Sequence, residues 1–218
     1  MNNGFIGYNR EVVPELIRKI QENYDNLYRD LTSGIQNDYI STMKTAWICP
    51  DAVSFFETEF TNAMNELVSD INVIFASVSE AVNSSCQAYS QAGGDVWTRR
   101  DIQTRGFQNY TIRGVIEDYN ANLGQGGNLD QYNLANDQLN KIKINCANYT
   151  ANITAAASNS GFVGANQQEA LRAALQTIDN KISDGFSAII NKTNTRVRAA
   201  VEQFGQIGAS TSTAYTAN

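Results

Sequence analysis

Residues 46–52 read AWICPDA, and this short stretch decides the expected fold because it has to interrupt a long helix. Pro50 pushes the residue before it out of the helical region of backbone conformation, so a helix arriving from the N-terminal side ends here. Asp51 is a suitable N-cap for the helix that follows. A break of a few residues between two long amphipathic helices favours their antiparallel packing. The stretch therefore predicts the corner of a helical hairpin.

Apolar residues approach this corner from both sides at helical spacing. They step mostly by three and four from Val13 up to the corner, and they continue beyond it as far as Tyr89. Such a stripe is the core-facing side of an amphipathic helix. Pro14 is tolerated only in the first turn of a helix, so the first helix is expected to begin near Val12. Residues 1–92 are therefore predicted to form one long helical hairpin.

The same spacing of apolar residues occurs a second time, 115 positions further along the chain. The first set is Ile20, Tyr24, Leu27, Leu31, Trp47, Phe56, Phe60, Ala63, Leu67, Ile71, Ile74 and Tyr89. The second set is Ala135, Leu139, Ile142, Cys146, Phe162, Leu171, Leu175, Ile178, Ile182, Phe186, Ile189 and Phe204. Most identities differ between the sets, so the repeat lies in the spacing, which is what a second hairpin requires.

The second predicted hairpin occupies residues 129–207 and has its own corner, where residues 161–166 read GFVGAN. The helix before this corner carries apolar residues from Ala135 to Ala156 in alternating steps of four and three, the period of a coiled-coil seam. The helix after it is expected to begin near Asn166. The predicted fold class is therefore all-α, with two long antiparallel helical hairpins packed as an elongated four-helix bundle.

The segment 93–128 between the hairpins is rich in glycine, with aromatic and β-branched residues scattered through it. These residues allow a short strand or β-hairpin near 107–119, and they equally allow an irregular strap. Some 35 extended residues reach roughly 115 Å, enough to climb a rod on the order of 50 Å long. The strap thus permits an antiparallel, intramolecular pseudo-dimer. The tail 208–218, rich in Ala, Ser and Thr, is expected to be disordered.

Composition limits the chemistry that the chain can perform. Its 218 residues include 16 Lys and Arg against 22 Asp and Glu, so the net charge is −6, without the basic excess typical of nucleic-acid binding. Histidine is absent, which excludes Ser-His and Cys-His nucleophiles and removes the commonest metal ligand. The acidic residues form no evident cluster. We therefore expect a protein that is not an enzyme, with no catalytic residue, cofactor or metal.

The three cysteines, Cys49, Cys86 and Cys146, are odd in number and widely spaced. This arrangement indicates neither a disulfide framework nor a zinc site, so all three are predicted to be thiols. No run of residues is long and apolar enough to span a bilayer. The first residues, MNNGFIG, lack the basic and apolar regions of a Sec signal peptide.

Both corners place an aromatic residue, any residue and a small residue ahead of a helix, with Trp47 and Cys49 at the first and Phe162 and Gly164 at the second. The aromatic residue can plug the open end of the helical seam, and the small residue lets the backbone turn tightly. With its flanking helices, this pattern resembles the Trp-X-Gly (WXG, or ESAT-like) family, small helical hairpins exported by type VII secretion systems. Cys49 stands where the family has glycine and Phe162 where it has tryptophan. No tyrosine here fits the family's Tyr-X-X-X-Asp/Glu export signal.

The resemblance implies a non-enzymatic protein, secreted or displayed on the surface of a bacterium without a Sec signal peptide, after a cytoplasmic stage. Its expected partner is a protein, either the secretion machinery or another helical protein, and the four corner residues form the expected contact motif. Association of two chains as a homodimer stays open. The alternative is a structural or membrane-acting helical bundle, such as a toxin component or a phage-associated rod, so membrane contact also stays open. No nucleic-acid partner is expected.

Overall fold

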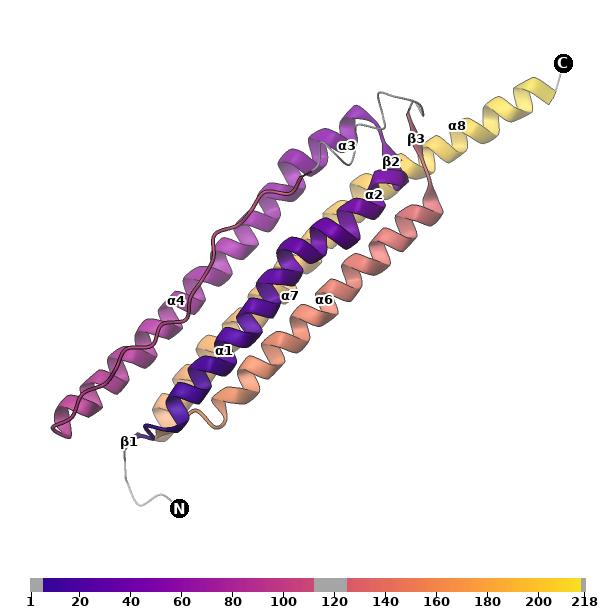
Figure 1. Ribbon diagram of the computed structural model, residues 1–218. Coiled ribbons are helices and arrows are strands. Elements are labelled where there is room, and N and C mark those ends of the chain that lie inside the picture. Colours follow the sequence, from indigo (N-terminus) through magenta and orange to yellow (C-terminus); the bar gives the residue numbers. More distant parts are fainter. Residues whose placement is uncertain (1–5, 112–124, 217–218) are drawn as a thin grey trace. The chain divides into compact units, whose positions relative to one another are not determined.

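The computed structural model describes residues 6–111 and 125–216, and most of them are helical, so the fold is all-α as predicted (Figure 1). The helical elements are α1 (Val12–Arg29), the π-helix η1 (Asp30–Ile40), α2 (Ser41–Ala46), α3 (Pro50–Ser54), the π-helix η2 (Phe55–Phe60), α4 (Thr61–Ala92), α6 (Leu129–Ala157), α7 (Ala165–Thr193), the π-helix η4 (Asn194–Arg198) and α8 (Ala199–Thr216). Two antiparallel pairs of two-residue strands accompany them, β1 (Gly7–Tyr8) with β4 (Phe162–Val163) and β2 (Trp47–Ile48) with β3 (Gly126–Gly127).

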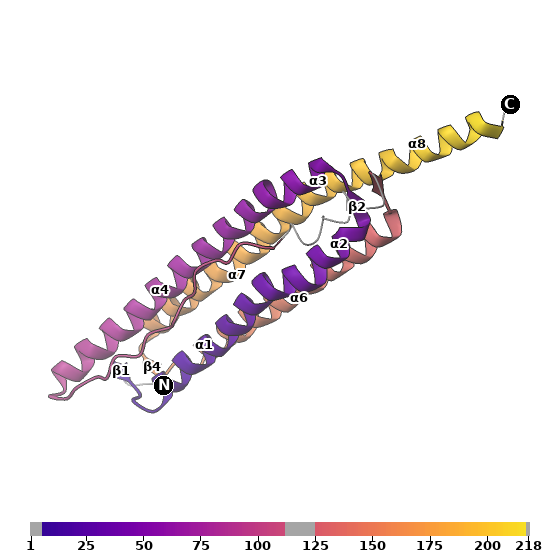
Figure 2. The same cartoon turned by 45° about the horizontal axis from the view of Figure 1, so that its top comes forward.

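Local sequence explains where the helices begin and end. The side-chain oxygen of Asn9 caps α1, because it accepts the backbone N–H groups of Glu11 and Val12 over 2.9 and 3.2 Å. Pro50 lies in the first turn of α3, where its missing N–H leaves no bond unmade. The stretch α1, η1 and α2 runs without a break to Ala46 and ends at the corner, as the sequence predicts (Figures 1 and 2). Its π-helical middle is not foreseen by the apolar spacing.

The chain divides into two compact units, and each unit draws on both predicted hairpins. The first unit comprises Met1–Arg29, Leu67–Gly106 and Asn145–Asp184, and the second comprises Asp30–Glu66, Phe107–Ile144 and Gly185–Asn218. The boundaries between the units fall inside helices such as α4 and α6. Each unit is therefore built by helices from both hairpins.

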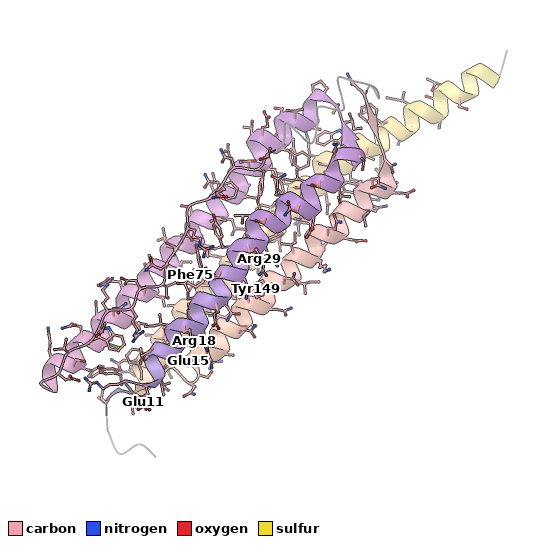
Figure 3. All side chains as sticks on the ribbon, in the orientation of Figure 1. Glu11, Glu15, Arg18, Arg29, Phe75 and Tyr149 are labelled. Carbon is pink, nitrogen blue, oxygen red and sulfur yellow. The ribbon has the colours of Figure 1, made fainter. Side chains whose placement is uncertain are left out.

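The core of the first unit is formed by the buried stripes of α1, α4, α6 and α7. Phe75 of α4 points toward α1 (Figure 3), and its ring meets that of Tyr24 edge-on with 5.0 Å between centroids. Glu15 and Arg18 pair on the exposed side of α1. The buried apolar residues of this core include Leu16, Ile20, Tyr24, Leu27, Leu67, Ile71, Phe75, Val78, Cys146, Ile153, Leu175, Ile178 and Ile182. Burial of these stripes stabilises the unit, since helices gain most of their stability from packing.

The core of the second unit is dominated by aromatic side chains around the first corner. Phe56 lies 5.1 Å from Phe55 and 5.5 Å from Phe60 between ring centroids, and Tyr39 lies 5.3 Å from Phe60. Trp47 completes this cluster from β2. Edge-to-face and tilted arrangements of this kind add to the free energy gained by burying the rings.

The second helical stretch of the first hairpin is rotated against the predicted apolar stripe. Three residues of the repeated set are half-buried in this stretch, namely Ala63, Ile74 and Tyr89, and so is Phe204 in the second hairpin. Phe75 and Ser90 are buried where Ile74 and Tyr89 were expected. A straight α-helix drifts by about 20° per heptad against steps of three and four, so a stripe read over many turns moves by one residue.

The strap agrees with one of the alternatives left open by the sequence, whereas the tail differs from expectation. Residues 95–111 have no regular secondary structure, so over 107–111 the strap follows the irregular one of the two alternatives left open, and 112–119 lie outside the described residues. The tail was expected to be disordered from Gly208, but α8 continues to Thr216. Residues 205–212 of α8 are exposed. Continuation of an existing helix, and not burial, therefore accounts for the order of this end.

Candidate functional site

The first corner lies in the second unit, where α2 ends at Ala46 and the chain passes through β2 into α3. Strand β2 pairs with β3, with Trp47 opposite Gly127. Trp47 is 2% exposed, and its ring lies 6.0 Å from that of Phe55 between centroids. A Cβ at Gly127 would lie 2.9 Å from Val201 Cα, so the close approach of the backbone there requires glycine. The corner tryptophan is therefore enclosed between aromatic rings and a paired strand.

The second corner lies in the first unit, between α6 and α7. Strand β4 pairs with β1, with Phe162 opposite Tyr8, and Phe162 is buried. Gly161 has a φ of +80°, and a Cβ there would lie 2.9 Å from the Cβ of Val12. Glycine therefore allows the chain to turn tightly against the start of α1.

The third position of the corner pattern differs between the two copies. Gly164 has a φ of +143°, a conformation that residues with a Cβ rarely adopt, so glycine is favoured there. Cys49 is extended, with a φ of −171°, which any residue adopts. Its thiol is buried and free. The expectation that a small residue permits a tight turn thus applies to Gly164 but not to Cys49.

Asn9 and Asn128 perform the same two tasks at the two corners. The backbone N–H of Asn9 donates to the carbonyl oxygen of Gly161 over 2.7 Å, and that of Asn128 donates to Ala46 over 2.8 Å. Asn9 also caps α1, and the side-chain oxygen of Asn128 accepts the N–H of Gln131 over 3.1 Å to cap α6. Each asparagine thus joins the start of one hairpin to the corner of the other.

A cleft of about 440 Å³ opens beside Trp47 in the second unit. Phe204 and Ile207 of α8 line one side of it, and Ile207 is 51% exposed. Asp51 lies at its edge and pairs with Arg196 over 3.0 Å. The indole Nε1 of Trp47 is buried and has no hydrogen-bond partner within the described ranges. The cleft is therefore lined by both apolar and polar side chains, and the buried indole Nε1 of Trp47 is not open to solvent.

Another cleft, of about 340 Å³, lies between α4 and α7 in the first unit. Ile74 and Ala81 of α4 line it, together with Leu171 of α7 and Phe162 of the second corner. Ile74 belongs to the predicted core stripe, and the rotation of α4 brings it to this cleft instead. Phe162 therefore borders an apolar cleft, whereas the cleft beside Trp47 in the other unit also has polar walls.

The titratable groups near these features are few and mostly paired on the surface. Burial raises the pKa of the Tyr39 hydroxyl in the second unit. Burial also raises the pKa of the Cys86 thiol in the first unit to about 12. All three cysteines are buried and lie outside any disulfide, so they are thiols as the sequence predicts. Within residues 6–111 and 125–216, no three His, Cys, Asp or Glu side chains are grouped so as to hold a metal ion.

Sequence reasoning named Trp47, Cys49, Phe162 and Gly164 and missed the two asparagines. The structure brings Trp47 and Cys49 together at one cleft in the second unit, whereas Phe162 and Gly164 belong to the first unit. The asparagines lie 119 positions apart, so a repeat read at a spacing of 115 does not align them. A search for an N-cap ahead of the first helix of each hairpin would have found both.

No family model, curated protein or solved structure matches the chain. None of the helices that the structure describes combines the length and the apolar character needed to cross a membrane.

Proposed function

We propose that this chain is a non-enzymatic helical-hairpin protein of the Trp-X-Gly type, exported from a bacterium by a type VII secretion system after a cytoplasmic stage, and acting by contact with another protein. The repeated corner carries the proposal. In each copy a buried aromatic residue, Trp47 or Phe162, sits on a two-residue strand beside a capping asparagine. Two corners of the same construction support two tandem hairpins.

The two hairpins lie antiparallel in this proposal, as an elongated four-helix bundle and an intramolecular pseudo-dimer. The crossed bonds of Asn9 and Asn128 support it, because each corner is bonded to the start of the other hairpin. A parallel pair would instead bring the two corners together. Spin labels on Asp51→Cys and Asn166→Cys, both at exposed positions, should lie on the order of 50 Å apart, the length of the helices between the corners. A distance under about 25 Å would contradict the arrangement.

The contact with the protein partner is expected at the cleft beside Trp47. Apolar surface that is open to solvent, such as Ile207 with its neighbours on α8, often marks a protein-binding site. Because the indole Nε1 of Trp47 is buried, a partner would meet the apolar side chains that line the cleft, Phe204 and Ile207 of α8. Aromatic anchors of this kind frequently dominate binding energy at interfaces.

Secretion provides the direct test. The tagged chain is expressed in a bacterium with an active type VII system and in a strain from which that system has been deleted. The chain should accumulate in the culture medium of the first strain and stay in the cells of the second. Equal release from both strains, or retention in both, would contradict export by this route.

The role of Trp47 is tested with a matched pair of substitutions. Trp47→Phe keeps an aromatic plug but removes the indole donor, whereas Trp47→Ala removes both. If the cleft beside Trp47 binds the partner, Trp47→Ala should reduce export more than Trp47→Phe does, because only Trp47→Ala removes the aromatic wall of the cleft. Release of dye from liposomes by the purified chain would instead favour the membrane-acting alternative.

A further inference from the structure

The strap segment 95–106 is held in the first unit by side chains of α1 and α4. After a turn at Gly93 and Gly94, where Gly94 has a φ of +71°, it runs without regular structure beside α4 (Figure 2). Its backbone N–H and C=O groups bond to side chains of the two helices. We call the face of α1 and α4 that carries these side chains the α1–α4 groove.

Asn83 on α4 makes the most complete set of these contacts. Its side-chain oxygen accepts the backbone N–H of Arg100 over 2.9 Å, and its amide donates to the carbonyl oxygen of Arg100 over 2.8 Å. The same amide donates to Ser79 of its own helix, and the same oxygen accepts the indole N–H of Trp97. Asn83 is 2% exposed, so this buried side chain uses both donors and both acceptor sites.

Gln21 on α1 repeats the pattern three residues further along the strap, at Gln103. Its side-chain oxygen accepts the N–H of Gln103 over 2.7 Å, and its amide donates to the carbonyl oxygen of Gln103 over 3.2 Å. We call each side chain that bonds both the N–H and the C=O of one strap residue a clamp. Between the clamps of Asn83 and Gln21, the hydroxyl of Ser79 accepts the N–H of Ile102 over 3.0 Å.

A third clamp is built from two helices. The hydroxyl of Tyr24 on α1 accepts the N–H of Arg105 over 2.6 Å and donates to the side-chain oxygen of Asn72 on α4 over 3.0 Å. The amide of Asn72 then donates to the carbonyl oxygen of Arg105 over 2.7 Å, which closes a ring. Tyr28, one turn beyond, donates its hydroxyl to Gly106 over 2.7 Å.

These contacts recognise main chain, because a side-chain amide presents one donor and one acceptor to an extended residue as a neighbouring strand would. The clamps recur at helical spacing, Asn72, Ser79 and Asn83 along α4 and Gln21, Tyr24 and Tyr28 along α1, so each set lies on one face of its helix. Affinity from such bonds does not depend on the sequence of the bound segment.

Selectivity comes from three side chains of the strap. Ile102 is 5% exposed and is the apolar anchor between the clamps. Arg99 pairs with Glu80 over 2.7 Å, and Arg105 pairs with Asp25 over 2.9 Å. The groove therefore favours an apolar residue with a basic residue three positions away on either side, and Ile102 contributes most because both ion pairs are exposed.

We propose that the α1–α4 groove is a binding site for an extended peptide with this basic–apolar–basic pattern, and that residues 97–106 are a ligand of the same class bound in cis. The covalent tether gives the strap an effective concentration of the order of millimolar. A peptide on another molecule therefore enters the groove when the chain's own strap is weakened. This proposal stands apart from the one on export.

The test uses the full chain and a fluorescently labelled synthetic peptide with the sequence of residues 95–108, followed by anisotropy. Ile102→Glu places a charge in the buried anchor position and releases the chain's own strap. This variant should bind the peptide at least about tenfold more tightly than the wild type does, since the tethered competitor is removed. Ile102→Ala, which is milder, is measured in parallel and should give an intermediate affinity.

Asn83→Asp, added to the Ile102 variant, removes the amide donor to Arg100 and should weaken peptide binding by about tenfold. Asn140→Asp is the matched control, because the side-chain amide of Asn140 donates to Asn136 of its own helix. It should leave binding unchanged. The proposal is overturned if both Ile102 variants keep their helical circular dichroism and bind no better than the wild type. It is equally overturned if a peptide carrying Ile102→Glu binds as tightly as the native peptide.

Discussion

The backbone N–H of Asn9 donates a 2.7 Å hydrogen bond to the carbonyl oxygen of Gly161, so the residue that caps α1 also fixes the corner that leads into α7. Asn128 and Ala46 repeat this relationship in the other unit, over 2.8 Å. In both cases the asparagine side chain caps the start of a helix, and the backbone N–H of the same asparagine bonds to a carbonyl oxygen at a corner. Substitutions can therefore separate the two contributions.

Gly161→Ala should lower the free energy of unfolding by about 2–4 kcal/mol. The left-handed φ of +80° costs a residue with a Cβ about 1–2 kcal/mol, and the added Cβ would lie 2.9 Å from the Cβ of Val12. Urea unfolding followed by circular dichroism measures the change. Gly208→Ala is the control, because nothing lies within 4 Å of a Cβ there. A loss at Gly161 no greater than at Gly208 would show that the corner does not need its glycine.

Asn9→Ala and Asn128→Ala should each destabilise the chain by about 1 kcal/mol, the usual effect of losing an N-cap side chain. The backbone bonds to Gly161 and Ala46 remain in both variants, so the corners should stay intact. Amide hydrogen exchange should quicken at the first turn of α1 in the first variant and of α6 in the second. Asn65→Ala, at an exposed position of α4, serves as the control and should change stability by less than about 0.5 kcal/mol. Equal effects at all three asparagines would argue against capping.

Phe75→Ala should cost about 3–5 kcal/mol, because the ring is fully buried and leaves a cavity beside Tyr24. Ile74→Ala should cost clearly less, since Ile74 lines an open cleft. Denaturant unfolding of the two variants compares the positions directly. If Ile74→Ala lowered the free energy of unfolding more than Phe75→Ala did, the core-facing side of α4 would contain Ile74, as the sequence predicts.

Stability should fall as the pH rises above 9, because burial raises the folded-state pKa of Cys86 from 9.0 to about 12. The neutral thiol is favoured in the folded state, so this contribution is complete below pH 9 and is lost between pH 9 and 12. Urea midpoints at pH 8 and at about pH 9.5, where tyrosines with a pKa near 10 are only partly ionised, measure the effect. Cys86→Ala should show a shallower decline over the same interval. An identical decline in the variant would assign the effect to other groups.

The chain's helical character and its two corners could be predicted from sequence because they depend on local interactions. Pro50 ends a helix wherever it lies, and apolar residues at steps of three and four identify the faces that need covering. Most of the predicted core residues are buried, among them Ile20, Leu139 and Phe186. The four corner residues could be named for the same reason, since two short motifs in phase are visible without coordinates.

Other features depend on contacts between distant residues. The phase of α4 drifts by one position over its length, and this places Phe75 in the core instead of Ile74. The path of the strap cannot be predicted from its own sequence, because Asn83 and Gln21 of the helices hold its backbone. In the sequence these two residues look like ordinary polar residues on a helix.

The sequence alone determined that this protein is made of long amphipathic helices broken at two matching corners, because helix periodicity and proline and glycine conformations act over a few residues. Tertiary structure alone decided which asparagine holds which corner, that Cys49 needs no special backbone conformation while Gly164 does, and that a strap of irregular chain fills a groove lined with amides. Those outcomes depend on hydrogen bonds between residues tens of positions apart, and the direction and partner of such bonds are set by packing.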